Sequence, residues 1–193
     1  MKPIRSFHAA TRVALGLACA VALAALPAAA RAQAFAEFGG GLAYPGPAPD
    51  GHVYSRGYGF RASVGHQLEP RVRVRFDATF SWFDDRTQFY PPCAFPGCTG
   101  PSYNVDRATV AGLSANWLVD VDRRGILYGI GGAGLYDVDA DHAKVALDVS
   151  AGAGISVPIR AGLRAFVEAR YHIPFGTTAE LPWIVPVTFG VRF

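Results

Sequence analysis

Apolar and polar residues alternate along most of this chain. The clearest stretch runs from Val72 to Phe83, where Val, Phe, Ala and Trp occupy one set of alternate positions and Arg, Asp, Thr and Ser occupy the other. Successive side chains of an extended strand point to opposite faces, so this period of two predicts a strand with one apolar and one polar face. Eight such segments are predicted, at residues 36–44, 58–67, 72–83, 105–121, 126–136, 144–157, 163–172 and 184–193.

The connections between these segments alternate in length. Long loops are predicted at 45–57, 84–104, 137–142 and 174–182, and short turns at 68–71, 122–125 and 158–162. Several of these stretches contain proline, which has no N–H to give to a strand ladder. Pro186 falls inside the last segment and is tolerable only near a rim. An even number of strands joined by alternating long loops and short turns is typical of an up-and-down outer-membrane barrel.

The two faces of the predicted strands differ in composition. One face holds Val, Leu, Phe, Ala and Tyr with hardly a charge, and the other mixes charged residues with Gly and Ser. Small residues beside charges suit a crowded barrel interior, because eight strands leave room only for interlocking side chains. The predicted fold is therefore all-β, an eight-stranded antiparallel up-and-down transmembrane β-barrel. We expect its lumen to contain an ion-pair network of Glu37, Arg61, Arg73, Arg75, Asp77, Asp148, Arg164, Glu168, Arg170 and Arg192.

Aromatic residues near the predicted strand ends suggest interfacial girdles. Those expected toward the loops are Tyr44, Trp82, Tyr136, Tyr171 and Trp183, and those expected toward the turns are Trp117 and Tyr128. The many glycines of segment 126–136 leave its phase ambiguous.

The first 32 residues have the pattern of a secretory signal peptide. Lys2, Arg5 and Arg12 precede an apolar run, and small residues lead to an expected cleavage after Ala32. This leaves one barrel domain at 33–193. The segment holds four of the 18 basic residues and no acid, so the formal charge of +3 becomes −1 on its removal. The basic character belongs to the leader, and nucleic acid is not expected as a partner.

Several features of the chain resemble those of a known protein family. The segment from Phe166 to His172 and the terminal Val-Thr-Phe-Gly-Val-Arg-Phe, together with the leader and the strand pattern, resemble the small eight-stranded outer-membrane β-barrels of the OmpA, OmpX and opacity-protein type. The resemblance implies a monomer in the cell outer membrane, surrounded by lipid and lipopolysaccharide. It also implies that the outer-membrane assembly machinery reads Phe189, Val191 and Phe193.

The predicted loop 84–104 is the candidate contact surface. Cys93 and Cys98 lie close together in it, and in an exported protein they are expected to form a disulfide. Two thiols without a nearby histidine would make a weak zinc site. Aromatic residues around the pair suit contact with a surface partner.

Other chemistry is not favoured by the sequence. Asp137, Asp139 and Asp141 resemble the start of a calcium loop, but His142 stands where that motif needs glycine. His172 has no serine at the alternate-residue spacing that would form a nucleophile and base. We therefore expect no cofactor, metal or catalysis, and a structural or surface-interaction role. Two alternatives remain: a narrow pore for small solutes, and a soluble periplasmic barrel whose apolar face points inward around a ligand.

Overall fold

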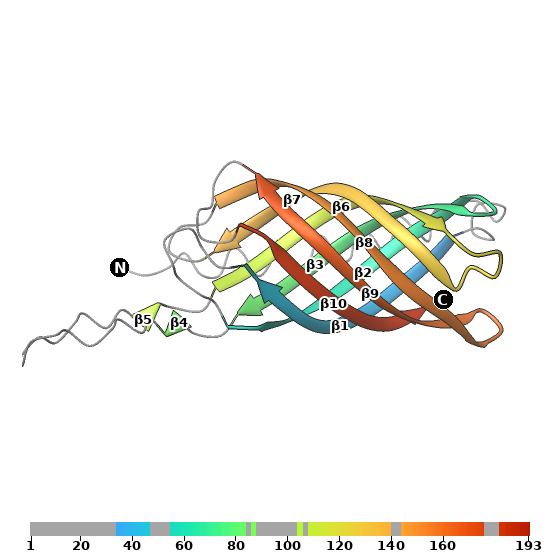
Figure 1. Cartoon of the computed structure of the whole chain (residues 1–193), viewed down its shortest axis with the longest axis horizontal. Coiled ribbons are helices and arrows are strands. Elements are labelled where there is room, and N and C mark those ends of the chain that lie inside the picture. Colours follow the sequence, from blue (N-terminus) through green and yellow to red (C-terminus); the bar gives the residue numbers. More distant parts are fainter. Residues whose placement is uncertain are drawn as a thin grey trace, which may run out of the picture.

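The computed structural model describes residues 34–46, 55–83, 86–87, 104–105, 108–139, 144–175 and 182–193. The predicted signal peptide and both cysteines of the predicted disulfide lie outside these ranges. Eight strands form a closed barrel in which each strand pairs antiparallel with its neighbours in the chain (Figure 1). Their bounds are β1 (Ala34–Pro45), β2 (Gly57–Glu69), β3 (Val72–Phe83), β6 (Ala108–Asp120), β7 (Leu127–Asp139), β8 (Lys144–Arg160), β9 (Leu163–Phe175) and β10 (Ile184–Arg192). The predicted fold is confirmed.

The barrel closes where the last strand meets the first. β10 pairs with β1 without interruption from Glu37↔Arg192 to Pro45↔Ile184. Backbone hydrogen bonds between Ala36 and Phe193, of 2.9 and 3.2 Å, extend this seam to the final residue. On the other side of β10 the ladder to β9 omits Val185 and Pro186, consistent with the N–H that proline lacks.

The two faces of the barrel are sorted by polarity. Phe76 on β3 is 60 % exposed, whereas its neighbours Arg75 and Asp77 are 0 % and 2 % exposed. The same alternation places Phe38, Leu147 and other large apolar side chains on the outside. The alternative of a soluble barrel with its apolar face inward is therefore wrong, because it requires the opposite phase in every strand.

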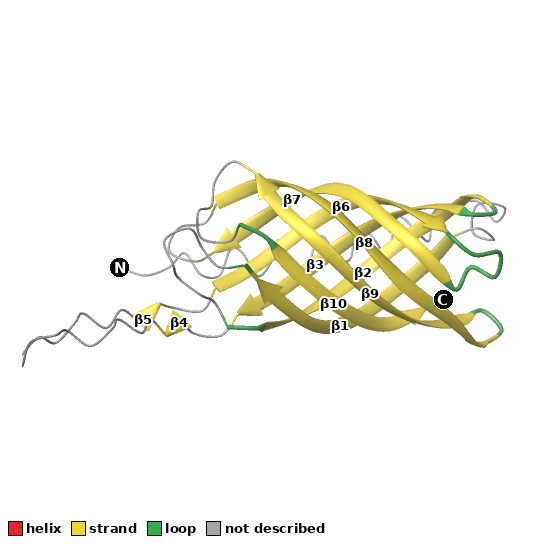
Figure 2. Cartoon of the chain, viewed as in Figure 1, coloured by secondary structure: helices red, strands yellow, loops and turns green. Residues whose placement is uncertain are grey.

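The turns gather at one end, which is also the end where β10 finishes (Figure 2). They comprise residues 70–71, 121–126 and 161–162. Gly125 and Gly162 have φ of 61° and 75°, a region that side chains other than glycine rarely adopt. We call this the turn end and the opposite one the loop end. None of the described segments is a helix long and apolar enough to cross a membrane.

Several predicted boundaries are wrong at the loop end. The stretch 84–104, predicted as loop, contains β4 (Arg86–Thr87), which pairs with β5 (Asn104–Val105) beyond the barrel rim (Figure 1). The barrel strand that follows begins at Ala108 rather than near Val105. β7 continues to Asp139, so only four residues separate it from β8. A strand can continue through acidic residues once it extends beyond the apolar layer of the membrane, because water solvates their carboxylates there.

Candidate functional site

The buried charged residues lie in the lumen of the barrel, which is therefore the candidate functional site. Because side chains alternate along a strand, β3 directs Arg73, Arg75 and Asp77 inward in succession, and β9 does the same with Glu168 and Arg170. Strand pairing then fixes their neighbours: Glu37 on β1 lies opposite Arg192 on β10. Charges far apart in the sequence meet in the middle of the barrel.

Glu168 and Arg75 form the centre of this network. Nη1 of Arg75 donates to Oε2 of Glu168 at 2.9 Å, and Nη2 donates to Oε1 at 2.8 Å, a bidentate pair. Glu168 also accepts hydrogen bonds from Arg61 and, at 2.9 Å, from the hydroxyl of Tyr128. Arg75 reaches Glu37 as well, at 2.7 Å.

A second carboxylate organises the side of the network nearer to β6. Asp77 accepts a hydrogen bond from Nη1 of Arg170 at 2.7 Å and another from the amide of Asn116 at 3.0 Å. Arg170 also donates to Oγ of Ser150 at 2.8 Å. Nε of Arg75 lies 2.8 Å from Oδ1 of Asp77, which joins the two halves of the network.

Further pairs flank the centre. Toward the turn end Arg73 pairs with Asp120, and Arg192 lies 2.6 Å from Glu37. Toward the loop end Nδ1 of His172 lies 2.8 Å from Asp148 and 3.1 Å from the hydroxyl of Tyr136.

Counted with His172 neutral, the charges of these paired groups balance. Five arginines face five carboxylates, namely Arg61, Arg73, Arg75, Arg170 and Arg192 against Glu37, Asp77, Asp120, Asp148 and Glu168. A buried charge without a partner is costly, and desolvation offsets much of the attraction within each pair. The network therefore specifies how the lumen is filled, and it leaves no excess charge there to attract one sign of ion.

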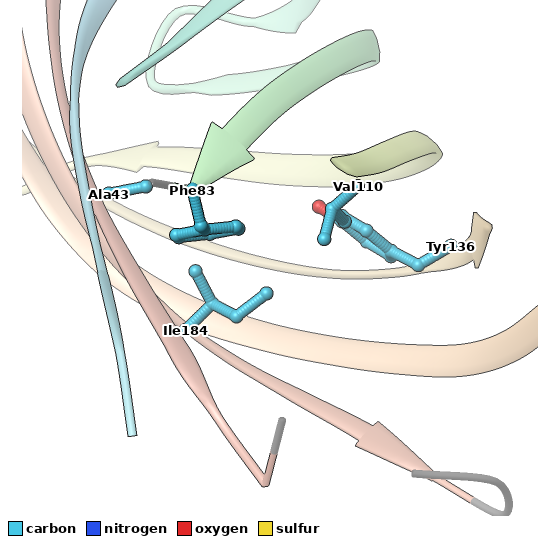
Figure 3. Packing of buried hydrophobic residues seen from close by; sticks show 5 residues of the cluster. All are labelled: Ala43, Phe83, Val110, Tyr136 and Ile184. Atoms are coloured by element: carbon cyan, nitrogen blue, oxygen red, sulfur yellow. The ribbon is translucent and has the colours of Figure 1, made fainter. Parts of the chain in front are cut away.

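An apolar cluster lies in the lumen at the loop end. Its members are Ala43, Phe83, Val110, Tyr136 and Ile184, which converge from five strands (Figure 3). Between this cluster and the charged network is a cavity of about 40 Å³, lined in part by Thr79, His172 and Arg170. A space of this size holds about one water molecule. The described lumen is thus a packed interior.

The structure brings together nine of the ten charged residues predicted for the lumen and separates one. Arg164 donates to Oγ and the carbonyl of Ser156, at 2.9 and 2.7 Å, and to the carbonyl of Gly125 at 2.8 Å. Its assignment to the ion-pair network is wrong among the described residues, because it lies at the turn end where backbone carbonyls are within reach.

Other residues of the site were missed by the sequence analysis. Tyr128 and Tyr136, expected in the outer girdles, are buried inside instead. Each ring fills space left by a glycine: a Cβ on Gly154 would lie 2.4 Å from the ring of Tyr128, and one on Gly112 would lie 2.6 Å from that of Tyr136. This matching of tyrosine with cross-strand glycine was the signal that could have fixed the phase of β7.

Metal binding gains no support from the described residues. Asp137 and Asp139 of the apparent calcium loop belong to β7, and Asp141 and His142 lie outside the described ranges. Within those ranges no group of three or more His, Cys, Asp or Glu side chains is placed to hold a metal.

The closed barrel, with its apolar outer face and charged lumen, has the fold of the small eight-stranded transmembrane β-barrels. No family model and no curated protein matches the sequence. Among solved structures the chain is similar to Neisserial surface protein A, NspA, at 15 % identity and a TM-score of 0.56 over 82 % of this chain and 95 % of that one. It also matches Ail, the attachment invasion locus protein of Yersinia pestis, at 15 % identity and a TM-score of 0.47, over 83 % and 99 % of the two chains. The resemblance to small eight-stranded outer-membrane barrels is confirmed at the level of the fold.

Proposed function

We propose that this protein is a non-enzymatic barrel of the cell outer membrane with a structural or surface-interaction role through its loops. The observation that carries the proposal is the combination of an apolar outer face with a lumen filled by paired charges. Exposure of side chains such as Phe38, Leu147 and Phe189 to water would cost a free energy of about 25 cal/mol per Å² of apolar surface. Contact of the same side chains with lipid avoids this cost.

Because the lumen is filled, a surface that binds partners is expected on the outside of the barrel. A narrow pore would need a continuous polar path, and the apolar cluster stands across the loop end of the described lumen. Recognition by partners then falls to the connections at the loop end, of which 84–107 is the longest. Its cysteine pair, Cys93 and Cys98, is proposed to form a disulfide.

The assembly signal proposed at the carboxyl end has a suitable geometry. Phe189 on β10 and Phe193 directly after it are 63 % and 61 % exposed, so another protein could contact them before the barrel closes. The proposed leader, residues 1–32, would bring the chain to that machinery.

Comparison of unheated and heated samples by electrophoresis tests the membrane barrel. A heat-modifiable band confined to the outer-membrane fraction is expected, since a closed barrel resists detergent until heated. A soluble band whose migration does not change on heating would contradict the proposal.

Shortening the longest loop tests the surface role separately. Residues 88–103 are replaced by Asn-Gly, a two-residue hairpin turn that suits the pairing of Thr87 with Asn104. We expect a folded barrel that retains less purified lipopolysaccharide, whereas a control with residues 47–54 shortened retains as much as the unmodified protein. Undiminished retention after the first change would refute a role for this loop.

A further inference from the structure

Arginines line a depression at the turn end of the barrel, which we call the basic vestibule. It has a volume of about 420 Å³ and opens between the first residues of β1, the turn at 70–71, the turn at 121–126 and the end of β10. Its charged lining consists of Arg71, Arg73, Arg123, Arg124, Arg164 and Arg192 with two acids, Asp120 and Asp122.

The acids of the vestibule are already engaged. Asp120 pairs with Arg73. Asp122 accepts hydrogen bonds from the backbone N–H groups of Arg124, Ile126 and Leu127, at 3.0, 2.7 and 2.7 Å, so its carboxylate holds the turn together. Those N–H groups, with Leu127 contributing most, also lower the pKa of Asp122 and keep it ionised.

The arginines are in excess. Arg192 is balanced by Glu37 from deeper in the lumen, which leaves four arginines facing the single carboxylate of Asp122. Arg71, Arg123 and Arg124 are exposed. Nε of Arg73 is buried and has no hydrogen-bond acceptor among the described residues. Guanidinium groups thus converge on this space from three parts of the fold, with more donors than the protein satisfies.

We infer that the basic vestibule binds a phosphate-type anion. A guanidinium group donates two parallel hydrogen bonds, which match the oxygens of phosphate. Groups that approach from several directions suit a tetrahedral anion better than a planar carboxylate. The proposed surface role requires the loop end to face out of the cell, which places the turn end on the periplasmic side. The phosphate then belongs either to a free anion or to the headgroup of an anionic phospholipid of the inner leaflet.

Calorimetric titration with pyrophosphate tests the site. The full barrel is held in phosphatidylcholine nanodiscs at low salt, because surface charges are screened as salt rises. R123Q/R124Q is expected to bind at least about tenfold more weakly than the unmodified protein. The matched control R56Q/R160Q removes the same charge from exposed arginines outside the vestibule and is expected to bind within about twofold of it. Heat-modifiable migration verifies that both variants are folded.

A second arm identifies the source of the phosphate. Native mass spectrometry counts phosphatidylglycerol molecules retained from mixed nanodiscs by the same proteins. Binding of pyrophosphate alone assigns the site to a free anion, and loss of retained lipid in R123Q/R124Q alone assigns it to a headgroup; either supports the inference. It is overturned if neither ligand binds, if both variants weaken binding equally, or if polyglutamate binds as tightly as pyrophosphate. These outcomes do not depend on what the loops bind, so this inference and the proposed function can fail separately.

Discussion

Replacement of Glu168 by glutamine tests whether the ion network holds the barrel in its folded state. Glutamine preserves the size of the side chain and removes its charge. Glu168 accepts four hydrogen bonds, two from Arg75, one from Arg61 and one from Tyr128. In Glu168→Gln the lumen keeps five arginines against four carboxylates, and an amide NH₂ group faces guanidinium donors that it cannot satisfy.

The expected cost follows from the burial of these groups. Both members of the Arg75–Glu168 pair are almost fully buried. Removal of one partner from a buried pair typically destabilises a protein by about 3–5 kcal/mol, because the remaining charge is uncompensated. We expect Glu168→Gln to lower the free energy of unfolding by about that amount.

Urea unfolding in lipid vesicles, followed by tryptophan fluorescence and by heat-modifiable migration, measures the change. Glu69→Gln on the exposed end of β2 is the control and is expected to shift stability by less than about 0.5 kcal/mol. The charge-balanced double variant Arg75→Gln/Glu168→Gln should lose less than the sum of its single variants. If Glu168→Gln matched Glu69→Gln, or if the single effects simply added, the reasoning would be refuted.

Three other measurements address separate parts of the structure. Gly154→Ala should destabilise the barrel by about 1–3 kcal/mol through overpacking against Tyr128, whereas Gly129→Ala, whose Cβ meets nothing within 4 Å, should be nearly neutral; urea midpoints compare them. The purified barrel should show no large, reproducible single-channel steps in planar bilayers, and such steps would restore the narrow-pore alternative. The pKa of Asp122, measured by carbon NMR of its carboxyl, should lie below 3.8. Because that pKa is depressed, the contribution of Asp122 to stability is present above the unfolded pKa and is lost as pH falls through the folded one. A normal midpoint would contradict the hydrogen-bonded turn.

The strands could be predicted because the alternation of apolar and polar residues can be recognised within each segment alone. Val72 to Phe83 alternates without a break, and the same segment is β3 in the structure. That alternation places Arg75 and Asp77 on the same face of the strand, and the structure shows that this face lies inside the barrel. The face that each side chain occupies can therefore be predicted wherever one face of a strand must meet lipid and the other must not.

The partners within the lumen could not be predicted in the same way. Which arginine meets Glu168 depends on the stagger of eight strands, and a pattern read along one strand does not contain that information. Tyr128 was misplaced because the glycines around it have no polarity to define a face. Arg164 was misplaced because its phase is inward but its height in the barrel puts it at the turn end.

The proline in β10 has a consequence for how the barrel opens. The joint between the two ends of the chain is hydrogen-bonded without a gap, while the ladder between β9 and β10 is interrupted at Val185 and Pro186. The weakest seam is therefore expected one strand away from the chain ends. Of Arg170 and Tyr171, the residue whose N–H points toward β10 rather than β8 should exchange its amide hydrogen faster than Gly41 and Leu42, whose ladders are continuous on both sides. Local fluctuations that admit water would start near the loop end of β9, and the carboxyl-terminal strand would stay attached to β1.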